Sequence, residues 1–142
     1  MKYLVLVSHG DFAEGLKTSL SMFASDKIDQ VIALGLKNGQ SADDFAETFK
    51  QAISVLNPED TLVLLADIIG GSPLTSALNV LSDLSRLEGT RVIGGMNLPM
   101  ALTAAITKDV LEGDAFVSGV IQESVSGIQE FNVVNETNED DI

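Results

Sequence analysis

The chain has 142 residues, 45% of them hydrophobic and 20% charged, which suits one folded core and argues against a disordered chain. It has no cysteine, which excludes a disulfide scaffold, a thiolate metal site and a cysteine nucleophile. Its formal net charge of −13 and the scatter of its 8 basic residues along the sequence speak against binding to nucleic acid or to an anionic membrane surface.

Short runs rich in apolar and β-branched residues predict four strands, at residues 2–8, 30–34, 61–66 and 90–94. The first and third runs are apolar almost throughout, as is typical of parallel strands that are covered on both faces. The first run is too short for a signal peptide, and no run approaches the ~18 residues of a membrane helix. We therefore expect a cytoplasmic protein without a membrane segment.

Helical periods with recognisable starts separate these strands. The expected start signals, in chain order, are Asp11 with Glu14, Ser41 with Asp44, Ser72 before Pro73, Pro99, and Asp114 for a helix that ends near Gly127. The alternation predicts an α/β fold with a doubly wound, mainly parallel four-stranded sheet and helices on both faces. We expect the flavodoxin-like strand order 2-1-3-4.

The last segment differs from the rest. Residues 128–134 predict a short extra strand, and residues 135–142 are polar and acidic enough for a disordered tail. A lone terminal strand must pair with an edge, either of its own sheet or of another subunit's sheet. We expect residues 1–134 to form a single domain.

The residues that carry chemistry converge at one predicted edge of the sheet. Strand one ends in Ser8-His9-Gly10, and strand three is followed by Asp-Ile-Ile-Gly-Gly-Ser-Pro at residues 67–73. In the expected strand order, the crevice beyond the carboxyl ends of these two strands is where a ligand binds. His9, the only histidine, therefore meets a carboxylate and a glycine-rich helix start.

This set of groups suits phosphoryl transfer. A neutral imidazole such as that of His9 is a good nucleophile, and a carboxylate such as Asp67 can fix its tautomer and stabilise the charge that develops on it. Gly71 lets the backbone approach an anion, and the amides beside Ser72 and after Gly10 can hold phosphoryl oxygens. One histidine without cysteine makes a transition-metal site improbable, so we expect no metal and no cofactor.

Each feature alone has a plainer explanation. A lone histidine after a strand is more often a satisfied polar residue than a catalyst, Asp67 could simply cap a turn, and residues 70–73 could be only a tight strand-to-helix turn. The sequence has no P-loop motif, no G-x-G-x-x-G and no G-x-S-x-G. Only the conjunction at one crevice favours a functional site.

At these residues the chain resembles the IIA component of the mannose-family sugar phosphotransferase system. The resemblance covers most of residues 1–134 and rests on three motifs in order: Ser-His-Gly at 8–10, D-x-x-G-G-S-P at 67–73 and G-x-N-x-P-M at 95–100. It implies that His9 accepts a phosphoryl group from phospho-HPr and passes it to a IIB histidine. Asp67 would be the carboxylate partner of His9, and Gly71 and Ser72 would lie against the phosphoryl group.

The resemblance further implies that Asn97 and Pro99 support the site from the third motif. It also implies a homodimer in which the terminal strand is exchanged between subunits, and an indirect link to the membrane components IIC and IID. Two alternatives stay open: a regulatory module whose phosphorylation state another protein recognises, and a phosphotransfer subunit of a dihydroxyacetone kinase.

Overall fold

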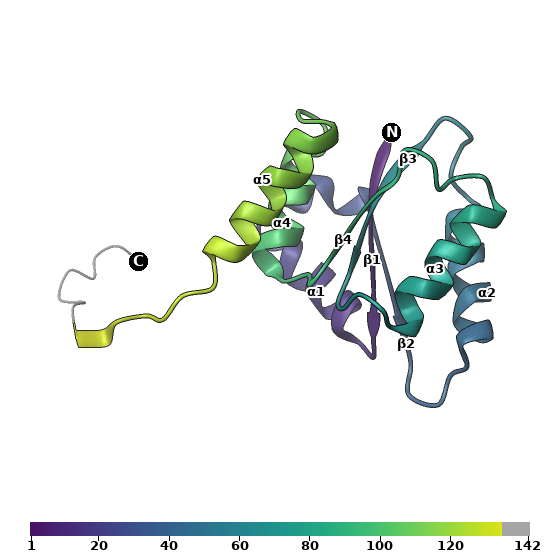
Figure 1. Cartoon of the computed structure of the whole chain (residues 1–142), viewed down its shortest axis with the longest axis horizontal. Coiled ribbons are helices and arrows are strands. Elements are labelled where there is room, and N and C mark those ends of the chain that lie inside the picture. The colour runs from purple at the N-terminus through teal and green to yellow at the C-terminus, as the bar shows by residue number, and fades with distance from the viewer. Residues whose placement is uncertain (135–142) are drawn as a thin grey trace.

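The computed structural model describes residues 1–134, which form a parallel four-stranded sheet between two layers of helices (Figure 1). The elements in chain order are β1 (Lys2–His9), α1 (Phe12–Leu20), the 3-10 helix η1 (Ser25–Gln30), β2 (Val31–Leu36), α2 (Ala42–Ile53), β3 (Thr61–Ala66), α3 (Ser72–Asp83), β4 (Arg91–Gly94), α4 (Leu98–Thr107) and α5 (Gly113–Ser126). The strand order is β2-β1-β3-β4, as predicted. The sequence did not predict η1.

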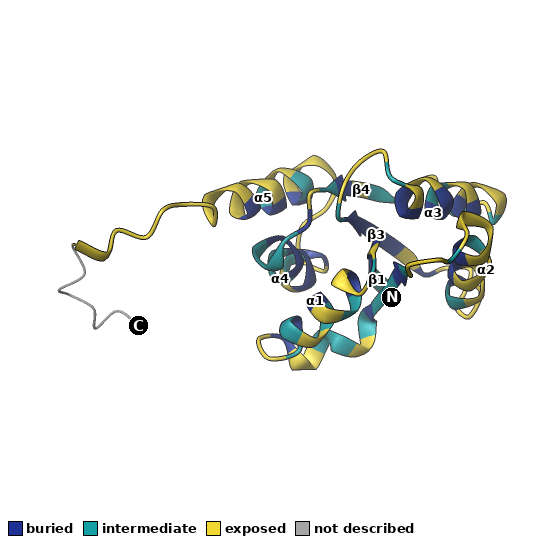
Figure 2. Cartoon of the chain, turned by 90° about the horizontal axis from the view of Figure 1, so that it is seen from below, coloured by how far each residue is buried: buried dark blue, intermediate teal, exposed yellow. Residues whose placement is uncertain are grey.

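The two central strands are β1 and β3, and their side chains pack into a hydrophobic core on each face of the sheet. Leu6 of β1 pairs with Leu65 of β3, and both are fully buried beneath α1, α4 and α5. The neighbouring Val5 and Leu64 are buried in the core on the opposite face. Helices α2 and α3 cover that face (Figures 1 and 2). Burying each of these side chains contributes about 1.5–3 kcal/mol, so residues 4–7 of β1 and 62–66 of β3 are all apolar.

The helix starts agree only in part with those predicted. The Ser41 hydroxyl accepts the amide of Asp44, as the capping motif predicts. Helix α3 is capped by Gly71, so Ser72 is its first residue rather than its cap. Helix α5 is preceded by Glu112, so the prediction of Asp114 as its cap was wrong.

The predicted capping box at the start of α1 does not form. Asp11 precedes the helix but makes no side-chain capping bond. Instead, the buried Ser8 hydroxyl accepts the amide of Ala13 at 2.7 Å. Asp11 and Glu14 turn toward Lys37, whose charge offers both carboxylates a stronger partner than a backbone amide.

The C-terminal segment leaves the body of the molecule after α5 (Figure 1). Residues 128–134 form no strand in the single chain, contrary to expectation, and end in a 3-10 turn. Their side chains are exposed, so no neighbouring strand pairs with them in this structure. The predicted tail, residues 135–142, lies outside the described residues.

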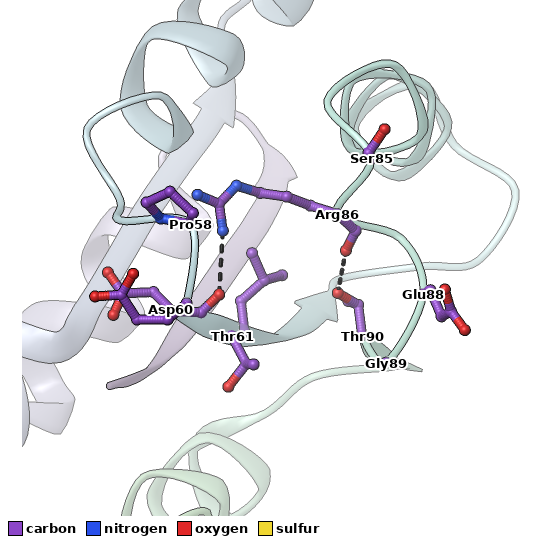
Figure 3. A pocket seen from close by; sticks show the side chains of 10 residues that line it. Pro58, Asp60, Thr61, Ser85, Arg86, Glu88, Gly89 and Thr90 are labelled. Carbon is purple, nitrogen blue, oxygen red and sulfur yellow. Dashed lines mark hydrogen bonds between the residues drawn. The ribbon is translucent and has the colours of Figure 1, made fainter.

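The amino end of the sheet is closed by polar contacts around a small pocket (Figure 3). The guanidinium of Arg86 donates to the carbonyl oxygens of Leu56, Asn57 and Asp60, at 2.8–3.1 Å. The Asp60 carboxylate in turn accepts the terminal ammonium of Met1 at 3.1 Å. These bonds satisfy backbone groups where the chain enters β3.

Candidate functional site

His9 is the last residue of β1, and Asp67 directly follows β3, so the pairing of these strands brings the two residues together. One carboxylate oxygen of Asp67 lies 2.8 Å from Nδ1 of His9 and accepts the His9 amide at 2.9 Å. The other accepts the amide of Ile68 at 2.8 Å. The His9 side chain is 47% exposed and that of Asp67 16%, so the imidazole faces solvent while its partner lies behind it.

These contacts determine which atoms of the two side chains carry a proton. Partial burial raises the pKa of Asp67, but hydrogen bonds from the His9 amide, the His9 ring and the Ile68 amide outweigh it and hold the pKa below the ordinary 3.8. Asp67 is therefore ionised at neutral pH and can only accept hydrogen bonds. Nδ1 of His9 must then carry a proton, and in the neutral ring this leaves the lone pair of Nε2 free.

Gly71 closes the site on the side of Nε2. A Cβ atom at this position would lie 2.7 Å from Cε1 and 3.2 Å from Nε2 of His9, so only glycine lets the backbone pass this close to the ring. Gly71 also caps α3, whose first amides have no acceptor within the helix. Ser72, the first residue of α3, is exposed, and its amide belongs to this group. A helix start beside a free imidazole nitrogen favours an anion there.

The turn after His9 depends on two glycines from different strands. Gly10 has a φ of +59° and donates its amide to the Leu36 carbonyl at 2.7 Å. Gly35 of β2 lies beneath this turn, where a Cβ atom would come within 1.8 Å of the Gly10 carbonyl oxygen. Sequence reasoning missed Gly35, although a glycine inside a strand is a known sign of close backbone approach.

The third motif makes contacts between α4 and α5. Asn97 caps α4 by accepting the Met100 amide at 2.8 Å and donates its own amide to the Ser124 carbonyl of α5 at 3.2 Å. Pro99 packs against Gly127, at the end of α5. Both residues therefore hold α4 and α5 together.

The rim of the site carries side chains that the sequence did not single out. Ile68 and Ile69, in the turn after β3, are 54% and 76% exposed, and Phe12 at the start of α1 is 46% exposed. In the sequence, Ile68 and Ile69 stand out as two adjacent apolar residues in an otherwise polar, glycine-rich turn. Lys37, just after β2, forms ion pairs with Asp11, at 2.7 Å, and with Glu14.

Within residues 1–134, no group of three or more histidine and acidic side chains is arranged to hold a metal ion. None of the helices in this part of the chain has the length and apolar character needed to cross a membrane.

Comparison with known proteins finds relatives of this chain. The profile of the family EIIA-man, described as PTS system fructose IIA component, matches residues 3–121. The chain is 28% identical over 99 residues to the PTS system fructose-specific EIIA component of Bacillus subtilis, covering 70% of this chain and 65% of that protein. It is 26% identical over 106 residues to the mannose-specific EIIAB component of Escherichia coli, covering 75% of this chain but 32% of that protein.

Solved structures show the same fold. The EIIA component from Streptococcus agalactiae superposes with a TM-score of 0.77 at 24% identity, over 92% of this chain and 98% of that one. A PTS IIA protein associated with a fucose utilization operon of Streptococcus pneumoniae gives a TM-score of 0.74 at 26% identity, over 95% of each chain. Because the family profile matches most of its length, the chain belongs to the mannose-type IIA family of the sugar phosphotransferase system.

Proposed function

We propose that the protein is a phosphohistidine relay of sugar uptake, in which His9 accepts a phosphoryl group from phospho-HPr and passes it to a IIB histidine. The observation that carries the proposal is the state of the imidazole. Nδ1 is bonded to the Asp67 carboxylate, and Nε2 lies free beside Gly71 at the start of α3. The names of the relatives, fructose-specific EIIA and mannose-specific EIIAB, agree with this role.

The transfer needs only groups that this chain supplies. The Nε2 lone pair of His9 attacks phosphorus in line, the P–N bond to the donor histidine breaks, and its electron pair returns to the donor ring. The Nδ1 proton stays in its hydrogen bond to Asp67, whose negative charge stabilises the positive ring formed in the step. The reverse steps deliver the phosphoryl group to the IIB histidine.

The phosphoryl oxygens would be held by backbone groups. The donors would be the amides at the start of α3, including that of Ser72, and those that follow Gly10 at the start of α1. Such preorganised donors stabilise an anion without a metal ion. Sugar specificity would then reside in the membrane components IIC and IID, because this site meets only a phosphoryl group and other proteins.

The test is the intact mass of the protein before and after incubation with phosphoenolpyruvate, enzyme I and HPr. We expect one acid-labile phosphoryl adduct in the wild type and none in His9→Gln, because the chain has no other histidine. Rapid loss of the adduct to a IIB protein would support the relay over a regulatory module. No adduct from a competent donor would overturn the proposal, and transfer to a dihydroxyacetone kinase instead of IIB would redirect it.

We also propose that the protein works as a homodimer in the cytoplasm, with the C-terminal segment of each subunit added to the sheet edge of the other. β4 is an edge strand, and an apolar groove beside it is lined by Ile69, Val92, Ile121, Val125 and Ile128, among others. The segment that follows carries the exposed side chains of Phe131 and Val133. Light scattering should give the mass of a dimer, and Phe131→Asp should shift it toward the monomer; a monomeric wild type would refute the exchange.

A further inference from the structure

The basic residues of this chain are divided very unequally between the two ends of the sheet. All eight lie within the described residues. Those at the amino end, where strands begin and helices finish, are Lys2, Lys17, Lys27, Lys50, Arg86, Arg91 and Lys108. Lys37 follows β2 directly, so it alone lies at the carboxyl end with His9.

Lys37 lies next to the turn that carries His9. In the register of the sheet, His9 is opposite Leu36, and the Leu36 carbonyl accepts the amide of Gly10. A Cβ atom built on Gly35 would lie 1.8 Å from the Gly10 oxygen and 3.6 Å from Nζ of Lys37. The ammonium group is therefore beside the residue that follows His9.

The ammonium group pairs with both carboxylates at the start of α1. Nζ lies 2.7 Å from the Asp11 carboxylate and also bonds Glu14. The hydrogen bond from Lys37, followed by its charge, lowers the pKa of Asp11, so that carboxylate stays ionised. Without Lys37, two uncompensated negative charges would lie at the helix start whose amides face the incoming phosphoryl group.

We propose that Lys37 sets the charge at the phosphoryl site: it offsets one of the two negative charges of Asp11 and Glu14 and thereby helps an anionic phosphoryl donor to approach His9 in an otherwise strongly acidic protein. This inference rests on the proposed phosphoryl acceptance by His9. The pairs are exposed, so they add little to folding stability. Their effect falls on the approaching anion. Removing the Lys37 charge increases the repulsion of that anion and should slow phosphorylation of His9 by roughly three- to tenfold at low salt.

The experiment compares two small reagents that modify the single histidine directly. Phosphoramidate is an anionic phosphoryl donor, and diethylpyrocarbonate is a neutral electrophile of imidazole. In Lys37→Gln we expect phosphorylation by phosphoramidate, measured by intact mass, to be roughly three- to tenfold slower than in the wild type. Carbethoxylation, measured by absorbance, should be unchanged, since charge matters little to a neutral reagent.

Matched variants separate charge from structure. Lys17→Gln removes the same charge near the far end of α1 and should react like the wild type. The triple variant Asp11→Asn, Glu14→Gln, Lys37→Gln carries no charge at these three positions, where the wild type carries a net charge of −1 and Lys37→Gln one of −2, so it should react at least as fast as the wild type. High salt should shrink the difference between Lys37→Gln and the wild type, because exposed charges are screened.

Two results would overturn the role of Lys37: equal rates for Lys37→Gln and Lys17→Gln, or equal slowing of both reagents, which would indicate a displaced turn. The proposed relay is judged separately by HPr. A wild type that reacts with phosphoramidate but accepts nothing from phospho-HPr would refute the relay, while the comparison of reagents would still decide the role of Lys37.

Discussion

The two ends of this sheet are built for different tasks. At the carboxyl end, His9 is 47% exposed, glycines bring backbone amides close to its ring, and the first amides of α3 have no acceptor in their helix. At the amino end, Arg86 binds three carbonyl oxygens, and Lys108 is fully buried with hydrogen bonds to Gln30 and Asp109.

The two ends differ in whether their polar groups already have hydrogen-bond partners. Free amides at the carboxyl end suit an anion that binds and leaves, because an amide that already donates to another acceptor cannot bind the anion. Satisfied groups at the amino end stabilise the fold, since an unpaired buried carbonyl or charge is costly. Substitutions at the two ends should therefore separate transfer rate from stability.

The largest expected effect is that of Asp67→Asn at the carboxyl end. Asparagine keeps the size of the side chain but removes the charge that fixes the Nδ1 proton and stabilises the positive ring. We expect phosphorylation of His9 by phospho-HPr to slow by roughly 100- to 1,000-fold, with a melting temperature close to that of the wild type. Quench-flow with intact-mass detection measures the rate; an unchanged rate would remove Asp67 from the mechanism.

Gly71→Ala tests the close approach of backbone to ring. The backbone at Gly71 has a φ of −90°, which alanine adopts without strain, so the fold should tolerate the change. The added methyl group, however, would lie 2.7 Å from Cε1 of His9 and must push the ring or the turn aside. We expect a loss of roughly ten- to 100-fold in transfer rate, because small displacements of reacting groups are costly.

Gly70→Ala is a control for this substitution, with the opposite balance. Gly70 has a φ of +94°, where alanine is strained, but no atom lies within 4 Å of its Cβ position. It should therefore cost stability, measured by urea unfolding, more than Gly71→Ala does. Equal transfer rates for Gly71→Ala and the wild type would contradict the role of Gly71.

The sequence predicted the backbone of this molecule better than its surface. Long apolar runs such as 61–66 predicted buried parallel strands, and the expected flavodoxin-like strand order is confirmed. That order brings His9 and Asp67 together. Lys37 and Gly35 were missed, because their roles depend on which turn lies above them. The strand expected at 128–134 does not form in the single chain, because alternating apolar side chains do not specify a pairing edge.

At the amino end, Arg86→Met should lower stability and leave transfer unchanged. Methionine keeps the apolar stem but leaves the carbonyl oxygens of Leu56, Asn57 and Asp60 without their donor. We expect the free energy of unfolding to fall by about 2 kcal/mol, or about 30-fold in the unfolding equilibrium. Arg91→Met, which breaks only an exposed pair with Asp114, should change stability by less than about 0.5 kcal/mol. Similar losses in both variants would contradict the bracing role of Arg86.

The smallest expected effect concerns acid and the Asp60 carboxylate beside Arg86. The amide of Asn57, followed by the terminal ammonium of Met1, holds the pKa of Asp60 below its ordinary 3.8. Because the folded pKa lies below the unfolded one, ionised Asp60 stabilises the fold above about pH 4, and that contribution is lost as the pH falls through the folded pKa. Urea unfolding should therefore show Asp60→Asn to be less stable than the wild type at pH 7, with the difference in stability closing below pH 4.

The control is Asp29→Asn, at an exposed position in η1, which should show no such difference at either pH. A gap for Asp60→Asn that persists unchanged at pH 3 would mean that its packing, not its charge, stabilises the amino end.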